Sequence, residues 1–429
     1  MTVAPQDSQM FRDLFADAEL SRLFTDTATL RAMLIVEGAL AKVQGEAGVI
    51  PQEAATYLHR ATMELQIDPG GLAAQIARDG IPVPALLAAF RKEAQAPEFT
   101  RYLHWAANSQ DIVDTALALR LRQVLTLLDG RLDALLTQLA DLAEAHAETP
   151  MLARTFGQPA VVTTFGAAVA TWGSGLLALR SELPDIRAAV CIVTLNGAAG
   201  TLSAMGPEGP ALRSALARAL GLADPGHSPQ VDRSHLHALA SWANRVLQAC
   251  DKIAGDLLLL SREGAVTMGG GQSSTMAQKR NPIASSVVRA LALHGNGLCH
   301  TLHAATPADQ RDGGAWFAEW LALPQLMSAT GKALLLLTGD RVTVEVDAMA
   351  ATLAATNDLI HAEALTFALA RDMPRPEAQA QVAAWAAETR VEGGSLLARA
   401  GVDPADYAPA RQWGEAPALA RRFAQSVRE

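Results

Sequence analysis

The sequence predicts an all-α protein with an elongated bundle of long helices at its centre. Half of its 429 residues are apolar but only 5% are aromatic, and Ala and Leu, two strong helix formers, supply much of the apolar fraction. From Asp111 to Thr149 there is no proline, and apolar residues recur in steps of three and four, as along one face of an α-helix. This stretch indicates one helix much longer than the average globular helix of about 11–12 residues.

Four further stretches show the same helical spacing and complete the predicted bundle. They cover residues 163–179, 234–263, 283–305 and 315–338. Five long segments in the middle of one chain are typical of an elongated helical bundle. A coiled-coil scaffold is the alternative, but the apolar seams lack sustained heptads with charged flanking positions.

Prolines interrupt both flanks of the predicted bundle and indicate shorter helices there. Neither flank shows the period-two alternation of a strand series. We therefore expect three domains: an N-terminal helical domain over residues 1–110, the central bundle over 111–350 and a small C-terminal helical domain over 351–429.

Composition excludes several classes of protein. The formal charge of −9 disfavours a general nucleic-acid binder, which needs a basic face. The chain does not open with a basic patch followed by an apolar stretch, and no apolar run approaches the roughly 20 residues of a membrane span. We therefore expect a cytoplasmic protein without a nucleic-acid or membrane partner.

The cysteines and histidines show no pattern of a metal site. The three cysteines form no CxxC pair, and two pairs of closely spaced histidines lack an evident third ligand. We expect no metal, and packing or surface roles for these histidines. Reduced thiols in the core are expected for Cys191, Cys250 and Cys299.

One connector between two predicted helices, Thr267 to Pro282, combines several groups that carry chemistry. Three consecutive glycines give a backbone that can open and close. Two hydroxyls follow at Ser273 and Ser274, and then the cationic Lys279 and its neighbour Arg280. The amide groups at the start of the next helix favour an anion. By spacing alone such a segment is more often an inert linker than an active-site loop.

The same connector resembles the signature of the aspartase/fumarase superfamily, Gly-Ser-Ser-x-Met-Pro-x-Lys-x-Asn-Pro. The matching residues are Ser273, Ser274, Met276, Lys279, Asn281 and Pro282. Gln272 stands in place of the glycine and Ala277 in place of the proline. These departures change the expected hinge of the loop but leave the hydroxyls and the lysine in place.

Two more segments resemble the other superfamily blocks, in the expected order along the chain. Residues 101–111 resemble His-x-Gly-x-Thr-Ser-x-Asp through His104, Ser109 and Asp111, with Ala106 and Asn108 as departures. Residues 154–160 resemble Arg-Thr-His-x-Gln-Pro-Ala. Residues 357–364 are similar to the small helical domain of adenylosuccinate lyases, so the resemblance covers nearly the whole chain. It implies the aspartase fold, with a central five-helix bundle between helical N- and C-terminal domains.

The second block lacks its histidine, and this absence indicates the type of reaction. Superfamily members that release an amine or amidine use a histidine general acid there, whereas this chain has Phe156. The segment of residues 81–90, which matches another histidine-bearing stretch of adenylosuccinate lyases, also has none. A nitrogen leaving group needs protonation. A carboxylate, with a pKa of roughly 4, does not. The sequence therefore favours a reaction in which a carboxylate adds or leaves.

The superfamily branch that adds a carboxylate acts on 3-carboxy-cis,cis-muconate in protocatechuate breakdown. Residues 309–320 resemble its Gly-Gly-Trp-x-Ala-Glu-Trp segment, and residues 14–51 resemble its N-terminal region. The resemblance implies closure of a lactone without a cofactor. Two alternatives remain: an adenylosuccinate-lyase-like β-elimination that releases fumarate, and a catalytically inactive helical scaffold.

The resemblance also implies roles for individual residues. Ser273 transfers a proton to and from carbon, and Lys279 stabilises the charge that develops on the substrate. Members of the superfamily are homotetramers whose subunits share each site, and the implied partner is a small tricarboxylate. The implied substrate-binding residues are His104, Ser109, Arg154, Gln158, Ser274, Met276, Asn281 and Arg311. A buried core histidine and a structural salt bridge are the alternative roles of His104 and Arg154.

Overall fold

The computed structural model describes residues 4–272, 275–276, 279–309 and 311–429. The chain forms two compact units. Unit 1 contains Met1–Arg131, Ser181–Gln248 and Ala290–Ala333, and unit 2 contains Leu132–Arg180, Ala249–Arg289 and Leu334–Glu429, as far as the structure describes them. The three predicted domains, with boundaries at residues 110 and 350, stay a prediction.

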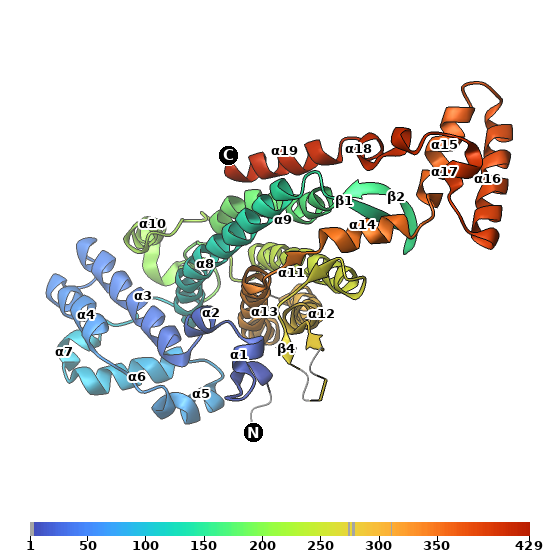
Figure 1. The fold of residues 1–429 in the computed structure, drawn as a ribbon. Coiled ribbons are helices and arrows are strands. Elements are labelled where there is room, and N and C mark those ends of the chain that lie inside the picture. The colour runs from blue at the N-terminus through green and yellow to red at the C-terminus, as the bar shows by residue number, and fades with distance from the viewer. Residues whose placement is uncertain (1–3, 273–274, 277–278, 310) are drawn as a thin grey trace. The chain divides into compact units, whose positions relative to one another are not determined.

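Five long helices contribute residues to both units and confirm the predicted all-α class (Figure 1). The 37 residues of the first give it a length of about 55 Å. The second runs 11 residues beyond the predicted end at 179. It contains Pro184, and this proline does not end the helix. The five helices are α8 (Ser109–Ala145), α9 (Phe165–Val190), α11 (Ser234–Arg262), α12 (Ile283–Ala304) and α13 (Gly313–Gly339).

Shorter helices also belong to unit 1, and the longest of them share one apolar core. The side chain of Thr25 accepts a hydrogen bond from Ala28 N and caps the longest of them. A Cβ atom added at Gly45 would lie 2.3 Å from that of Ala55, so α3 and α4 pack in close contact. The elements are η1 (Pro5–Asp7), α1 (Arg12–Phe15), α2 (Ala18–Arg22), α3 (Asp26–Glu46), α4 (Gln52–Glu64), η2 (Gly70–Leu72), α5 (Ala73–Asp79), α6 (Val83–Ala94), α7 (Pro97–Thr100), η3 (Ser203–Glu208) and α10 (Gly209–Leu220).

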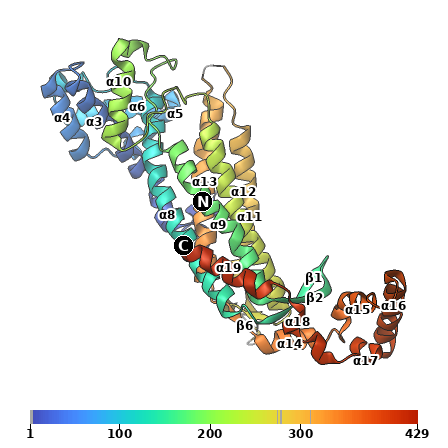
Figure 2. The same cartoon turned by 90° about the horizontal axis from the view of Figure 1, so that it is seen from above.

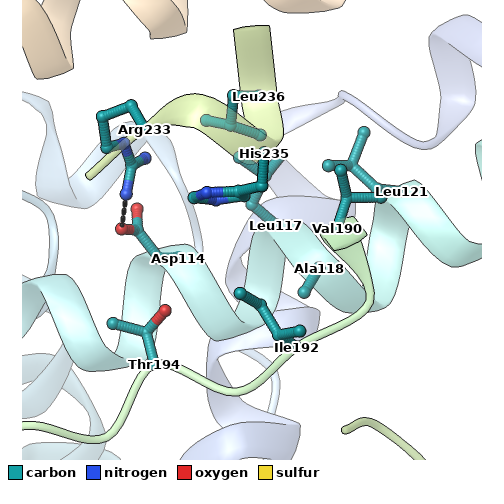
Figure 3. Close-up of a pocket in the computed structure, with 10 residues that line it drawn as sticks. All are labelled: Asp114, Leu117, Ala118, Leu121, Val190, Ile192, Thr194, Arg233, His235 and Leu236. Atoms are coloured by element: carbon teal, nitrogen blue, oxygen red, sulfur yellow. Dashed lines mark hydrogen bonds and ion pairs between the residues drawn. The ribbon is translucent and has the colours of Figure 1, made fainter. Parts of the chain in front are cut away.

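Within unit 1 a buried ionic cluster joins three of the long helices. Arg233, immediately before α11, donates to Asp114 of α8 at 2.7 Å and to both carboxylate oxygens of Glu319 of α13 at 2.8 and 2.6 Å. Trp316 Nε1 donates to the other oxygen of Asp114 at 2.9 Å. Figure 3 shows Arg233 facing Asp114, with His235 beside them among aliphatic side chains. Burial lowers the pKa of His235 to about 4, so this histidine is neutral at physiological pH.

Polar pairs connect further long helices inside unit 1, where Figure 2 shows α11 and α12 side by side. Ser241 of α11 lies 2.9 Å from His303 of α12, and Gln248 donates to Asn296 at 3.0 Å. One helix among the described residues, α13, is long and apolar enough to cross a membrane, yet 61% of its most apolar window is buried inside the protein. Such burial is typical of a core helix. The prediction of core thiols is confirmed, since the three cysteines are free and buried.

Unit 2 contains the strands, which the sequence pattern did not predict. β1 (Pro150–Thr155) and β2 (Gln158–Thr164) form an antiparallel hairpin with Leu152 opposite Val162 and a register shift before Arg154. Two short ladders pair β3 (Val266–Thr267) with β6 (Thr343–Val344) and β4 (Gly271–Gln272) with β5 (Arg280–Asn281).

The C-terminal part of unit 2 is helical, as predicted. Its last helix packs against α9, because a Cβ atom at Gly173 would lie 2.0 Å from the ring of Phe423. The elements are α14 (Val346–Ala354), η4 (Leu359–His361), α15 (Ala362–Leu369), α16 (Arg375–Glu392), α17 (Leu396–Ala400), η5 (Pro404–Tyr407), α18 (Pro409–Gln412) and α19 (Ala416–Arg428).

Candidate active site

The predicted site residues fall into both units. Unit 1 holds His104, Ser109 and Arg311, and unit 2 holds Arg154, Gln158, Met276, Lys279 and Asn281. Ser273, Ser274 and Ala277 lie outside the described residues.

The first block forms a strained turn immediately before α8. His104 and Ala106 have φ angles of +65° and +58°, in the left-handed region that costs L-residues about 1–2 kcal/mol. Ala106 stands where the superfamily pattern has glycine, and its backbone explains that preference. Ser109 begins α8, where free backbone amides favour an anion.

A buried glutamate holds the histidine of the first block. Glu37 of α3 is 1% exposed, and its Oε1 lies 2.7 Å from His104 Nδ1. Burial lowers the pKa of His104, but the charge and hydrogen bond of Glu37 outweigh it, so the pKa is raised above its usual value. The other carboxylate oxygen, Glu37 Oε2, is buried without a partner among the described residues. The pair therefore favours an imidazolium whose Nδ1–H donates to Glu37.

Asp111 fixes the turn to a second loop of unit 1. One of its carboxylate oxygens accepts from Asn196 N at 2.9 Å and from Gln230 Nε2 at 3.0 Å, and the other from Asn108 N and Gly197 N, both at 3.0 Å. Burial raises the pKa of Asp111 to about 6, although these four hydrogen bonds oppose the shift. Asp111 thus organises the backbone around the block.

Arg311 joins the same cluster. Its Nη1 donates to Asn108 Oδ1 at 2.9 Å, and its Nη2 donates to the carbonyls of Gly197 and Ala198 at 3.3 and 2.5 Å. The structure thus brings the predicted residue 311 to the first block, 203 positions away in sequence. Because these donors contact protein atoms, a substrate carboxylate at Arg311 would have to share or replace the backbone carbonyls.

The second block lies at the tip of the hairpin in unit 2. Phe156 and Gly157 form the two-residue turn with φ angles of +50° and +74°, as in a type I′ turn. The Phe156 side chain is fully exposed, at 104%. Gln158 is exposed at the start of β2, whereas Arg154 Nε lies 3.0 Å from Glu263 Oε1. Arg154 and Glu263 also line a cavity of ≈ 610 Å³ within unit 2.

The third block begins and ends at the ladder of β4 and β5. Gly271 pairs with Asn281, and a Cβ atom at Gly270 would lie 2.4 Å from the Asn281 carbonyl oxygen, so the two chain segments need a glycine there. Asp340 accepts from Gly269 N at 3.1 Å and fixes the approach to the ladder. Lys279 is exposed and lies four residues before the start of α12.

The chain matches one established protein family. The profile of the lyase family matches residues 15–294, more than half of the chain. The chain belongs to the aspartase/fumarase superfamily of lyases. This membership confirms the predicted resemblance and the predicted fold.

Among the lyases similar to this chain are bacterial 3-carboxy-cis,cis-muconate cycloisomerases. The protein from Pseudomonas aeruginosa is 37% identical over 86% of this chain and 83% of its own length. The one from Bradyrhizobium diazoefficiens is 35% identical over 86% and 85%. The solved structure of the 3-carboxy-cis,cis-muconate lactonizing enzyme from Pseudomonas putida superimposes with a TM-score of 0.92 at 31% identity and covers 98% of this chain and 99% of that one.

Two features of this lyase were missed by the sequence interpretation. Glu37 lies in the apolar run from Met33 to Leu40, and a lone carboxylate in such a run is a signal of a buried partner. The turn from Asn196 to Ala198 carries no charged side chain and acts through its backbone. Only the folded chain shows that it lies beside Asp111 and Arg311.

Proposed function

We propose that the chain converts 3-carboxy-cis,cis-muconate to 4-carboxymuconolactone by intramolecular addition of a carboxylate. The observation that carries this proposal is Phe156, the exposed turn residue at the position where amine-releasing members have a histidine acid. A carboxylate nucleophile is ionised at pH 7 and needs no such group. The cycloisomerases similar over 86% of the chain support the same reaction.

In this mechanism the new C–O bond forms as the electron pair of the double bond moves toward a conjugated carboxyl group. The resulting aci-carboxylate carries extra negative charge, which Lys279, Asn281 and the N-terminal amides of α12 stabilise. Ser273 then delivers a proton to carbon and recovers its own from water. In the reverse direction Ser273 removes the proton and the carboxylate leaves. The proposal requires no cofactor.

Three substrate carboxylates require several cations and donors. We assign the three carboxylates to three groups of residues: the first block with Arg311, Arg154 and Gln158 of the second block, and Ser274 and Met276 of the third. The pKa of His104 is raised by the charge and hydrogen bond of Glu37, and this favours the cationic ring that suits a carboxylate. Arg154 already faces Glu263 at 3.0 Å, so part of its charge is compensated before substrate binds.

We also infer a homotetramer whose subunits share each site. A fully exposed phenylalanine at a hairpin tip and two leucines of unit 1, Leu293 at 71% and Leu321 at 70% exposure, are apolar surface that a partner subunit would cover. Light scattering coupled to size exclusion would measure the mass, and a monomer at working concentration would contradict this inference. A cytoplasmic location stays a prediction.

Ultraviolet monitoring of the purified protein with 3-carboxy-cis,cis-muconate, and separately with adenylosuccinate, tests the proposed reaction. Turnover of the muconate alone is expected. Cleavage of adenylosuccinate would indicate a β-eliminating lyase, and no turnover of either by folded protein would indicate an inactive scaffold. Ser273→Ala should reduce kcat by about 10²–10⁴-fold, the usual contribution of acid–base catalysis. Ser286→Ala, which removes an exposed hydroxyl that donates to Pro282 O at 3.0 Å, is the matched control.

A further inference from the structure

Unit 1 contains a cavity of ≈ 270 Å³ that none of the candidate site residues lines. It lies among Phe24, the first turns of α3, the first third of α8 and the first half of α13. Its wall is mainly apolar and includes the side chains of Phe24, Val113, Leu117, Trp320, Leu323 and Pro324.

One cation, Arg120, faces this apolar cavity, and no described residue supplies it with a counter-ion. Its Nη1 donates to Thr29 Oγ1 at 2.8 Å, its Nε donates to Ala116 O at 3.3 Å, and its guanidinium carbon lies 5.7 Å from the centre of the Phe24 ring. Among the described residues no carboxylate forms an ion pair with Arg120, and none accepts a hydrogen bond from its Nη2. Burial alone lowers its pKa to about 10, which agrees with a cation that lacks compensation.

The two carboxylates that line the cavity do not supply that compensation. Glu319 is buried and has both oxygens on Arg233, at 2.8 and 2.6 Å. Asp26 is the one exposed residue of the lining and lies in the first turn of α3, where water and the helix N-terminus stabilise its charge. Burying an unpaired cation is costly, so an anion that reaches Arg120 gains a strong charge-assisted hydrogen bond.

We propose that this cavity is a second ligand site, which binds a small monocarboxylate with one ring. The carboxylate contacts Arg120 Nη2, and the ring packs between Trp320, Phe24 and Leu323. A volume of ≈ 270 Å³ lies just below the roughly 300–1,000 Å³ of sites for drug-sized ligands, so a ligand with one ring fits. A second carboxylate would also meet the charge of Asp26.

Benzoate is the probe, and benzamide is its neutral analogue of the same shape. Isothermal titration of the full-length protein should show one saturable benzoate site per chain, with benzamide about tenfold weaker or more. Arg120→Met should weaken benzoate by roughly ten- to hundredfold, the effect of losing a hydrogen bond between charged groups. Asp26→Asn should tighten it, because the repulsion at the open end is removed. Magnetisation transfer from benzoate to the indole of Trp320 would locate the ring.

Control variants distinguish benzoate in this cavity from benzoate bound elsewhere on the protein. Arg122→Met removes an arginine two residues farther along α8 that donates to Leu220 O and Gly221 O, outside the cavity, and should leave the affinity unchanged. Leu117→Phe retains Arg120 but fills the cavity, so it should also weaken benzoate binding. It provides the test if Arg120→Met does not fold. Unchanged binding in both cavity variants would overturn the proposal. Loss of binding in His104→Ala alone would place benzoate in the active site. Equal competition by chloride would show a site for inorganic anions only. Either result would also overturn the proposal.

Discussion

Replacement of Glu37 by glutamine should reverse the pH dependence that His104 gives to the free energy of unfolding. The variant keeps an oxygen that can accept from His104 Nδ1 but removes the buried charge 2.7 Å away. Coulomb's law with an effective dielectric constant of about 20 gives about 6 kcal/mol at that separation as a ceiling. Desolvation offsets much of it, and hydrogen bonds to charged groups contribute about 1.5–3 kcal/mol net. We expect Glu37→Gln to lower the free energy of unfolding by that smaller amount in mild acid.

The sign follows from the direction of the pKa shift. The pKa of His104 is raised in the folded state, so the stabilisation is fully present below the unfolded pKa of about 6.5 and is lost as pH rises through the folded pKa. Without the Glu37 charge, burial dominates over Asp111 and lowers the pKa, so the variant gains stability as pH rises through this range. The difference between wild type and variant should therefore shrink as pH rises from about 6.5 through the folded pKa of His104.

Urea denaturation across this pH range and nitrogen-15 spectra of the histidine side chains measure the two effects. If protonated His104 holds a substrate carboxylate, Glu37→Gln should also raise KM by roughly tenfold near neutral pH, with a smaller change in kcat. Glu64→Gln, an exposed change on α4, is the control and should leave both profiles unchanged. A His104 that titrates identically in wild type and Glu37→Gln would refute this reasoning.

Three further predictions concern other parts of the fold. Phe156→Asn should leave the free energy of unfolding unchanged or raise it by up to about 1 kcal/mol, because asparagine tolerates positive φ. If the Phe156 ring contacts a partner subunit, light scattering should show that the same variant forms a weaker tetramer. Gly173→Ala should cost about 1–3 kcal/mol in denaturation, since the new Cβ would lie 2.0 Å from the Phe423 ring, and limited proteolysis should then release α19. Asp111→Asn should lower the free energy of unfolding by about 1–3 kcal/mol above pH 6, because an amide NH₂ cannot accept hydrogen bonds from Asn108 N and Gly197 N. An unchanged urea unfolding curve would contradict this prediction.

The long helices could be predicted within a few residues because their signal is local. Proline-free stretches with apolar steps of three and four predicted α11 and α12 to within one residue at each end, at 234–263 and 283–305 against Ser234–Arg262 and Ile283–Ala304. The end of α9 was wrong because Pro184 is accommodated inside a helix. The hairpin of β1 and β2 was missed because its turn places Phe156, a residue that disfavours positive φ, where a turn signal would have glycine or asparagine.

The candidate site was predictable as three separate blocks and not as a set of contacts. The resemblance identified His104 and Asp111, but their partners Glu37 and Asn196 lie 67 and 85 positions away in sequence. No periodicity encodes such pairs, because they depend on how α3 and a loop of unit 1 pack against α8. The roles of Lys279 and Asn281 stay predictions, because these roles depend on contacts with the substrate.

The ionic cluster of Arg233, Asp114 and Glu319 constrains how this sequence can change over generations. One guanidinium binds two buried carboxylates, so replacing Arg233 alone leaves two buried charges without a cation, at a cost of about 3–5 kcal/mol. Replacing either carboxylate alone leaves guanidinium donors without their acceptor, which is also destabilising. Replacing all three together by apolar residues of similar volume can be neutral or stabilising. The three positions therefore form one epistatic unit: a mutational library that varies them singly would find only losses, whereas one that varies them jointly could reach a viable alternative core.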